Sequence, residues 1–501
     1  MYPDRAAQAS SALQLFVRSD LAQQLESHGS HEPTRHLLEL FERSQKSVPA
    51  YAKFLREQGV DPTRIRTLDD FRQLPLTTKE NYHHRYPLAE RCREGDLNDS
   101  HMVAASSGST GEPTFWPRAF TDELAVTARF EQVFRDSFAA DTRRTLAVVC
   151  FPLGTWVGGM FTASCCRHLS TKGYPLLLVT PGNQKAEIFR VVRALGPLFE
   201  QTVLLGYPPF LKDVIDAGSA EGVPWHSLSL KLVLAGEVFS EEWRTLVSER
   251  AGMKNPVTDF ASLYGTADGG VLGNETPLTV GIRRFLAERS DVAQALFGEA
   301  RLPTLVQYDP WERYFEAHER TLVFSGDGGV PHLRYHISDT GGIFSYPALI
   351  DRLHDYGFDA EQAARTAGAT RLHRLPFVYV FGRSHFAVSY YGANVFPDTV
   401  SIGLEQPETR AFVTGKFVLE VKEDSRRNRQ LTVAVELAPD VTGEPALADR
   451  VATAILNVLL RLNSEFTNYV PAERRLPVVT LWPAGHPEYF PVGVKHRYAR
   501  K

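Results

Sequence analysis

The chain has 501 residues, of which 43% are hydrophobic, and its 55 basic and 59 acidic residues give a net charge of -4. A chain of this length exceeds a single ordinary domain, and its nearly balanced charge excludes both the basic footprint of a nucleic-acid-binding protein and a polybasic membrane patch. We therefore expect small-molecule partners and a large domain followed by a smaller one.

The four cysteines indicate a reducing compartment. Cys165 and Cys166 are adjacent and no pair has C-x-x-C spacing, which argues against a disulfide framework and against a zinc site. No apolar core of a signal peptide follows Met1, and no stretch approaches the roughly 18 apolar residues of a membrane span. We expect a cytoplasmic protein without a membrane partner.

The first hundred residues predict helices. Leu37, Leu38, Leu40 and Phe41 form one apolar face, and residues 51–58 form another that ends at Gly59. Thr67 is a candidate cap for a short helix, and the segment 74–80, Leu-Pro-Leu-Thr-Thr-Lys-Glu, begins the next one after a proline stop.

A Ser/Thr/Gly-rich loop follows the apolar run 102–105 and occupies residues 106–114, Ser-Ser-Gly-Ser-Thr-Gly-Glu-Pro-Thr. Backbone N–H groups and hydroxyls in such a turn bind phosphate well, although loops of this composition are as often plain surface connections. A Walker A loop is excluded, because Glu112 and Pro113 follow Gly111 where that motif needs Lys and Ser or Thr.

Beyond the loop, apolar runs rich in Val and Leu alternate with amphipathic stretches such as residues 186–199. The runs occupy residues 145–151, 174–180, 202–206 and 228–235. This alternation predicts an α/β domain with largely buried strands, in which ligands lie at the carboxyl ends of the strands. Trp156, Tyr207 and Phe239 follow three of these runs, and they form either the wall of an apolar pocket or aromatic core filling.

Short polar motifs continue in the second half of the chain. They are Gly236-Glu237, the Tyr-Gly-Thr-Ala-Asp segment 264–268, the Arg-Tyr-His-Ile-Ser-Asp segment 334–339, and the Gly-Arg-Ser-His segment that opens residues 382–397. The tail predicts a small α+β domain, because residues 417–421 and 431–436 alternate like paired strands and residues 447–462 form an amphipathic helix.

Taken in order, these motifs resemble those of the AMP-forming ligases, which include acyl-CoA synthetases, adenylation domains and luciferases. The segments 48–51 and 74–79 and the run 382–397, which ends in Gly-Ala-Asn-Val-Phe-Pro, resemble the phenylacetate-CoA ligase branch. The resemblance implies an α/β fold, with a large N-terminal adenylate-forming domain of buried sheets and flanking helices over residues 1–383. It also implies a small, mobile α+β lid domain over residues 384–501, which carries the catalytic lysine.

The resemblance implies a role for each motif. Asp268 would hold Mg²⁺, His385 would stand at the hinge, and Lys495 would be the catalytic lysine, with Lys501 and Arg497 as residues that could be mistaken for it. Phosphate-binding residues would be Ser106, Ser107, Gly108, Ser109, Thr110 and Gly111, with Thr110 also catalytic. Adenine- and ribose-binding residues would be Gly236, Glu237, Tyr264, Gly265, Asp339 and Arg383.

The chain departs from the family pattern at Ala267, Ile337, Ser338, His385 and Phe386, which indicates a divergent member. Asp268 is one methylene shorter than the usual glutamate, so we expect it to bind the metal through water or to shift its loop. His385 replaces an aspartate; it either makes domain rotation sensitive to pH or is a tolerated hinge residue, and we favour the latter.

The implied function is ATP-dependent activation of a carboxylic acid to an acyl-adenylate, followed by transfer to coenzyme A. An amine or a carrier-protein thiol is the alternative acceptor, and a degraded protein that binds nucleotide without turnover is an alternative of another class. Retention of Asp268 and Asp339 favours the enzyme. Relatives suggest a homodimer, and the sequence leaves the acid and the acceptor open.

Overall fold

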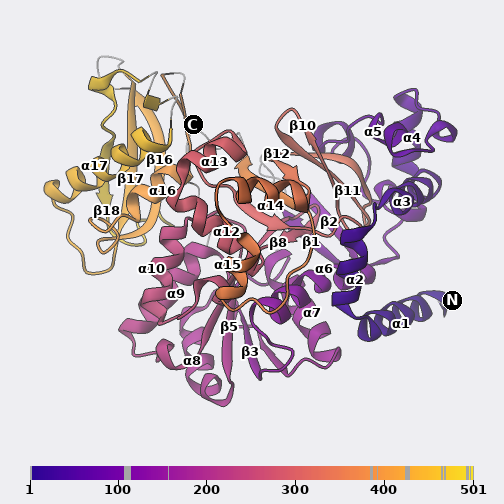
Figure 1. Cartoon of the computed structure of the whole chain (residues 1–501), viewed down its shortest axis with the longest axis horizontal. Helices are drawn as coiled ribbons and strands as arrows, with labels where there is room; N and C mark the ends of the chain where they lie inside the picture. Colours follow the sequence, from indigo (N-terminus) through magenta and orange to yellow (C-terminus); the bar gives the residue numbers. More distant parts are fainter. Residues whose placement is uncertain are drawn as a thin grey trace.

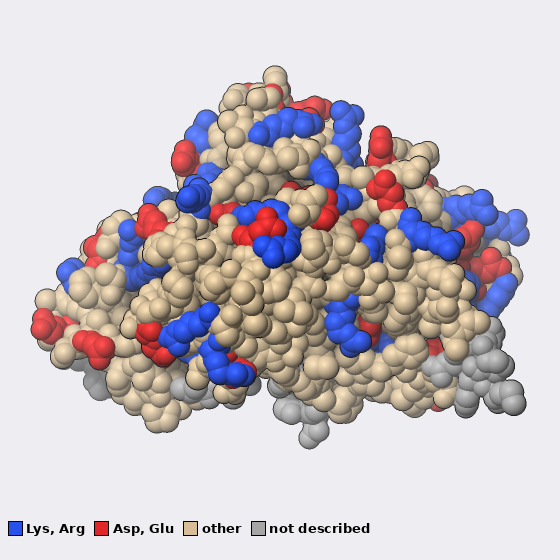
Figure 2. Space-filling model, turned by 90° about the horizontal axis from the view of Figure 1, so that it is seen from below, with Lys and Arg blue, Asp and Glu red and all other residues tan. Residues whose placement is uncertain are grey.

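The structure is a computed structural model that describes residues 3–106, 114–155, 157–383, 388–391, 393–423, 429–463, 466–467, 470–491, 496 and 498–499. The N-terminal helices lie at one end of the molecule and the C-terminal sheet lies at the other, with a large sheet between them (Figure 1). Within the described ranges, no helix is both long and apolar enough to cross a membrane. Lys and Arg side chains are interspersed with Asp and Glu on the face seen in Figure 2.

The N-terminal region is helical, as predicted. Its helices are α1 (Pro3–Arg18), α2 (Leu21–Ser30), α3 (Thr34–Ser47), α4 (Pro49–Glu57) and α5 (Leu68–Arg72). Thr67 caps α5 in a capping box with Asp70, because the Thr67 hydroxyl accepts the Asp70 N–H and the Asp70 carboxylate accepts the Thr67 N–H. The apolar faces of α3 and α4 form a cluster that also contains Leu333 of the large sheet.

The large sheet is mixed. In the described part of the chain it has the order β10-β11-β12-β13-β9-β8-β7-β6-β5-β3-β4. Strands β4, β3, β5, β6 and β7 are parallel, and antiparallel pairing begins at β8. The parallel strands are β3 (Thr145–Val149), β4 (Leu176–Val179), β5 (Gln201–Gly206), β6 (Leu230–Ala235) and β7 (Phe260–Thr266). Four of these five are the predicted Val- and Leu-rich runs.

The antiparallel half was not predicted as strands. It consists of β8 (Gly270–Asn274), β9 (Thr304–Gln307), β10 (Tyr314–His318), β11 (Thr321–Gly326), β12 (His332–Phe344) and β13 (Phe377–Arg383). A separate hairpin, β1 (Ser100–Ser106) and β2 (Thr114–Ala119), carries the Ser/Thr/Gly-rich loop between its strands.

Helices cover both faces of the large sheet. Along β3, Ala147 and Val149 pack toward α6 and α7, whereas Leu146 and Val148 pack toward α8, α9 and α10, because successive side chains of a strand point to opposite faces. These helices are α6 (Phe120–Gln132), α7 (Val157–Thr171), α8 (Lys185–Leu195), α9 (Pro208–Ala220) and α10 (Glu241–Ala251). The remaining helices of this domain are α11 (Pro256–Asp259), α12 (Pro277–Glu288), α13 (Ser290–Phe297), α14 (Tyr346–Asp355) and α15 (Ala360–Thr366).

The C-terminal part forms the α+β domain that the sequence predicted. Its sheet has the order β16-β17-β18, and it shares one apolar cluster with its helices and a short hairpin. The elements are β14 (Val388–Tyr390), β15 (Ala393–Val395), α16 (Pro397–Leu404), β16 (Val413–Glu423), β17 (Arg429–Leu437), α17 (Pro445–Leu462) and β18 (Val478–Trp482). This cluster contains no residue of the large sheet.

Candidate functional site

A cleft of about 3230 Å³ lies between the large sheet and the small domain. Its lining comes from the carboxyl ends of the parallel strands, from the β7–β8 turn, from β12 and from the C-terminal segment. Sequence-predicted residues on this lining are Tyr207, Gly236, Glu237, Tyr264, Gly265, Asp268 and Asp339. Residues predicted from separate motifs therefore share one cavity.

Asp268 lies in the turn that joins β7 to β8 and is 2% exposed. Tyr335 of β12 donates a hydrogen bond of 2.7 Å from its hydroxyl to Asp268 Oδ2, and Lys79 Nζ lies 3.8 Å from the same oxygen. Burial raises the pKa of this carboxyl, but the Lys79 ammonium and hydrogen bonds from Thr266 and Tyr335 outweigh burial. The pKa of Asp268 is therefore held well below its ordinary range, and the group is ionised.

Two buried guanidinium groups fix the turn that carries Asp268. Arg118 of β2 donates a hydrogen bond of 3.0 Å to the carbonyl oxygen of Asp268 and a second one to that of Ala267. Arg313 donates a hydrogen bond of 3.1 Å to the carbonyl oxygen of Gly269. The backbone is thus held on both sides of Asp268, which sets the direction of its carboxylate.

Lys79 is a site residue to which the sequence reasoning gave no chemical role. It begins a π-helical turn, Lys79–His83, which is capped by Thr78. Thr77 pairs with β12, where its N–H donates to the Arg334 carbonyl at 3.1 Å and its carbonyl accepts the His336 N–H at 2.9 Å. The sequence contains one indication of a role for Lys79: it ends the segment 74–79, which resembles the phenylacetate-CoA ligase branch.

Lys79 supplies the positive side chain beside Asp268. His83 and His332 lie in the same buried cluster of rings around Tyr335. Burial lowers the pKa of His332 to about 3 and lowers the pKa of His83 well below its ordinary value, so both imidazoles are neutral at pH 7. The positive charge nearest the Asp268 carboxylate in this part of the cleft is therefore that of Lys79, and the two histidines contribute none.

Asp339 lies on β12 and is 5% exposed. The Tyr264 hydroxyl donates a hydrogen bond of 2.8 Å to Asp339 Oδ2. Tyr264 is on β7, so the contact joins the parallel half of the sheet to the antiparallel half. The residues predicted to bind adenine and ribose are therefore direct neighbours.

Ser338, which stands where the family pattern has glycine, has a left-handed backbone with φ of 62°. An L-residue in this region of backbone conformation costs about 1–2 kcal/mol.

We expect Ser338→Gly to raise the free energy of unfolding by about 1 kcal/mol, because glycine adopts this φ without strain. The gain is smaller than the full strain because glycine also increases the conformational entropy of the unfolded chain. Urea unfolding measures this. Ser262→Gly, inside β7, is the control and is expected to lower stability; a loss of stability in both variants would contradict the prediction.

Gly236 and Tyr207 form a close pair at the ends of β6 and β5. Gly236 has φ of 85°, and a Cβ on it would lie 2.7 Å from the Tyr207 ring. The Tyr207 ring packs edge-on against Phe151, with ring centroids 5.0 Å apart. Glycine is thus needed at position 236 both for its backbone conformation and for the closeness of the ring. The next residue, Glu237, is hydrogen-bonded to Tyr498 of the small domain.

Phe239 does not line the cleft. Its ring packs against Trp243, with centroids 5.0 Å apart, and lies under the guanidinium groups of Arg244 and Arg283 at 5.0 and 5.4 Å. Of the two alternatives that the sequence left open, Phe239 therefore fills the core. Tyr207, in contrast, lines the cleft. Apolar side chains that the sequence reasoning did not single out also line it, namely Phe130, Phe151, Val157, Phe161 and Val271.

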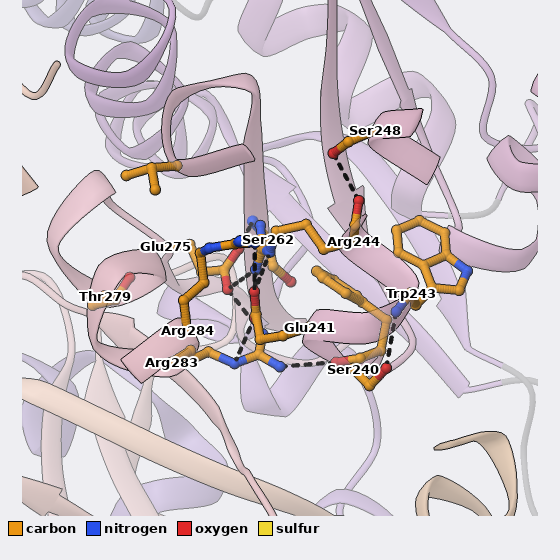
Figure 3. A network of polar contacts seen from close by, with 12 residues as sticks. Ser240, Glu241, Trp243, Arg244, Ser248, Ser262, Glu275, Thr279, Arg283 and Arg284 are labelled. Atoms are coloured by element: carbon orange, nitrogen blue, oxygen red, sulfur yellow. Dashed lines mark hydrogen bonds and ion pairs between the residues drawn. The ribbon is translucent and has the colours of Figure 1, made fainter. Parts of the chain in front are cut away.

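A buried network of two carboxylates and two guanidinium groups supports this side of the cleft (Figure 3). Glu275 accepts hydrogen bonds from Arg244 at 2.7 Å, from Arg283 at 2.9 Å and from the Ser262 N–H of β7 at 2.8 Å. Arg283 also donates a hydrogen bond of 2.8 Å to the carbonyl oxygen of Phe239. Burial raises the pKa of Glu275, but Arg244 and Arg283 outweigh burial and lower it. The network fixes residues 236–239 relative to the Tyr264 strand.

Several predicted site residues lie outside the described residues: Ser107, Gly108, Ser109, Thr110, Gly111, Trp156, His385 and Lys495. The structure also does not describe the side chains of Ser106 and Arg383. Their described neighbours do line the cleft. Ala105 and Thr114 flank the Ser/Thr/Gly-rich loop, and Pro491 and His496 stand on either side of Lys495 in the sequence.

No protein-family model matches the chain. It is 26% identical over 357 residues to the phenylacetate-coenzyme A ligase of Thermus thermophilus, covering 70% of each chain. It is 23% identical over 402 residues to that of Aromatoleum evansii, covering 79% of this chain and 78% of the relative. A 2-hydroxyisobutyryl-CoA ligase in the postadenylation state with R3-HIB-AMP superposes with a TM-score of 0.64 at 14% identity, covering 93% of this chain and 88% of the other. An open conformation of 2-hydroxyisobutyryl-CoA ligase with 2-HIB-AMP and CoA superposes with a TM-score of 0.52 at 14% identity. This match covers 93% of this chain and 90% of the other. These solved structures show that the fold is shared.

Proposed function

Because the chain is a divergent member of the AMP-forming ligase superfamily, similar to its phenylacetate-CoA ligase branch, we propose that it activates a carboxylic acid with ATP and passes the acyl group to coenzyme A. The observation that carries the proposal is the shared cleft of Asp268 and Asp339. These two residues come from motifs 71 positions apart (339 minus 268) and have the chemistry needed for a metal-bound polyphosphate and for a ribose.

The surroundings of Asp268 fit Mg²⁺. The carboxylate is ionised, faces the cleft and has the Thr266 hydroxyl beside it, so the donors are hard oxygens. Among the described residues, no group of three or more His, Cys, Asp or Glu side chains could enclose a metal. Mg²⁺ usually takes one or two carboxylates and completes its shell with phosphates and water, so one carboxylate in this place is a sufficient protein ligand. When bound, the ion would neutralise charge on the triphosphate.

The proposed first step joins a carboxylate oxygen to the α-phosphorus of ATP and breaks the bond to the β-phosphate, releasing pyrophosphate. Since two anions must approach, the catalyst has to supply positive charge and fixed positions. We assign phosphate binding to residues 106–114 and Lys79, ribose binding to Asp339, and neutralisation of the reacting oxygens to Lys495. The apolar lining near Tyr207 would hold the organic part of the acid.

In the proposed second step, the small domain rotates about the segment near His385 and removes Lys495 from the cleft. The thiol of coenzyme A then attacks the acyl carbon, loses its proton, and displaces AMP. We propose coenzyme A because the curated relatives are named coenzyme A ligases. An amine or a carrier-protein thiol would use the same first step.

Carboxylate-dependent exchange of labelled pyrophosphate into ATP, measured with a panel of aliphatic and aromatic acids, tests the proposal. We expect exchange with at least one acid and trapping of its adenylate as a hydroxamate by hydroxylamine. Coenzyme A would then yield a thioester and AMP. ATP binding without exchange on any acid would instead identify a nucleotide-binding protein without turnover.

We expect Asp339→Ala to raise the KM for ATP about tenfold, because two ribose hydroxyls lose a charged acceptor and hydrogen bonds to charged groups contribute about 1.5–3 kcal/mol. The KM for the acid should stay near its wild-type value. Tyr264→Phe is the matched variant: it removes only the 2.8 Å hydrogen bond to Asp339 and should have a smaller effect. An unaltered KM for ATP in Asp339→Ala would argue against the ribose role.

A further inference from the structure

We propose that Arg301 is a positioning residue that holds the small domain in the orientation used for acid adenylation. The inference rests on the proposed two-step reaction and adds the residue that controls which step the enzyme is ready to perform. The inference is based on the contacts of Arg301, which join residues of the large domain to residues of the small domain.

Arg301 belongs to the large domain and lies between α13 and β9. Its side chain is 4% exposed. It donates a hydrogen bond of 2.7 Å to Asp398 Oδ2 and one of 3.2 Å to the carbonyl oxygen of Phe381. Its guanidinium lies 4.7 Å from the Phe381 ring centroid and 4.1 Å from that of Phe396. The guanidinium group therefore lies against two aromatic rings and also donates hydrogen bonds to a carboxylate and to a carbonyl oxygen.

The partners of Arg301 come from both domains. Phe381 is on β13 of the large sheet, whereas Phe396 and Asp398 stand at the start of α16 in the small domain. In the sequence, Phe381 precedes the end of β13, whereas Phe396 and Asp398 follow the start of β14, the first described element of the small domain. A rotation of the small domain would carry Phe396 and Asp398 away from Arg301.

Glu299 makes this contact reversible. It belongs to the large domain, and its carboxylate lies 3.2 Å from Arg301 Nη2. Arg301 would thus keep one carboxylate partner after Asp398 has left, which avoids the cost of a buried, unpaired charge. The Arg301–Asp398 contact therefore stabilises one orientation of the small domain, and it can be broken at low cost. A domain that alternates between two orientations needs contacts of this kind.

The orientation seen here is the one suited to adenylation. Pro491, His496 and Tyr498 of the small domain line the cleft together with Asp268 and Asp339. Tyr498 is hydrogen-bonded to Glu237, which follows β6. Described C-terminal residues on both sides of Lys495 in the sequence therefore belong to the cleft wall in this orientation. Removing the contacts of Arg301 should reduce the fraction of molecules in which the small domain has this orientation.

The decisive comparison is Arg301→Met against Arg289→Met. Arg289 is the control for the type of contact, because it also pairs with an aspartate, Asp291, at 2.8 Å and lies 5.9 Å from a phenylalanine ring, although its side chain is 42% exposed and all these groups are in the large domain. We expect Arg301→Met to lower the kcat of pyrophosphate exchange about tenfold, with KM for ATP and acid nearly unchanged. Thioester formation from preformed acyl-adenylate and coenzyme A should be unchanged or faster. Arg289→Met should alter neither rate.

A second readout measures the orientation without activity. Lys416 of β16 and Asp213 of α9 form a 2.7 Å ion pair across the two domains, and all four native cysteines are buried. In an Asp213→Cys/Lys416→Cys background, a short bismaleimide should cross-link the domains faster when Arg301 is present than in Arg301→Met. Asp398→Asn, a milder change that leaves Arg301 in place, should give an intermediate rate.

Equal exchange and equal cross-linking in Arg301→Met and Arg289→Met would overturn the proposal. A raised KM for ATP with unchanged cross-linking would also overturn it, since Arg301 would then act in substrate binding. If the wild-type chain shows no exchange with any acid, the proposed function fails, and the cross-linking comparison still decides whether Arg301 sets the orientation.

Discussion

Asp268→Asn is expected to lower carboxylate-dependent pyrophosphate exchange about 100-fold, the scale of losing one group that stabilises transition-state charge. Asparagine has nearly the same shape and retains an oxygen that can accept the 2.7 Å hydrogen bond from the Tyr335 hydroxyl. What it lacks is the negative charge that would hold the metal and that lies 3.8 Å from the Lys79 ammonium. The loss should appear in kcat and should be only partly relieved by excess Mg²⁺.

Asp268→Glu is the informative companion, because it restores the charge and the side-chain length of the family pattern. Activity well above that of Asp268→Asn would support metal binding. Asp309→Asn is the control for a buried carboxylate elsewhere: Asp309 accepts a hydrogen bond from the Trp311 N–H and lies 3.5 Å from Arg129. A full exchange rate in Asp268→Asn would reject the metal role.

The depressed pKa of Asp268 also fixes the sign of a pH effect. The folded state favours the ionised form, so this residue stabilises the fold at pH values above the unfolded pKa of about 3.9 and the contribution is lost as the pH falls through the lower folded value. Between pH 5 and 8 the charge is constant. A pH-dependent exchange rate in that range should therefore persist unchanged in shape in Asp268→Glu.

The second large effect is expected for Lys495→Ala, which should lower the exchange rate by about 100-fold or more while leaving the fold intact. The reason is that, in the proposed reaction, the variant would delete a positive charge that acts on the reacting oxygens as carboxylate and phosphate approach. Hydrolysis or thioesterification of preformed adenylate should be much less affected, because in the proposed second step the lysine would have left the cleft.

Lys501→Ala is the matched control for Lys495→Ala, since it removes a neighbouring basic residue of the same tail and should leave exchange unchanged. Coincident thermal unfolding curves of both variants and the wild type would show that the fold is kept. An unchanged exchange rate in Lys495→Ala, or a large loss in Lys501→Ala, would reject the assignment.

The parallel half of the sheet could be predicted from local pattern, but the antiparallel half could not. Strands β3, β5 and β6 are continuous Val- and Leu-rich runs because both of their faces are buried, and the edge strand β4 has a similar apolar sequence. β12 instead alternates buried residues with partly exposed ones and contains a left-handed residue at Ser338, so its sequence does not have the continuous apolar pattern that predicts a buried strand. Tertiary pairing with β11 and β13 makes this segment a strand.

The candidate site was predictable only where one motif carried its chemistry. Asp268 and Asp339 could be named because their motifs resemble those of the AMP-forming ligases, and both residues line one cleft. Lys79 could not be found in this way, because its place depends on the pairing of Thr77 with Tyr335, more than 250 positions away. For Phe239 the sequence left open whether the ring forms a pocket wall or fills the core, and the structure places it beneath the guanidinium groups of Arg244 and Arg283.

The bridge between Thr77 and Tyr335 has a consequence for synthesis on the ribosome. An early segment of the chain reaches its final place only when β12, more than half-way along the polypeptide, has emerged from the exit tunnel. A nascent chain that has already formed the parallel strands still lacks the lysine beside Asp268. The part of the cleft around Lys79 and Asp268 is thus assembled late in synthesis, from segments far apart in the chain.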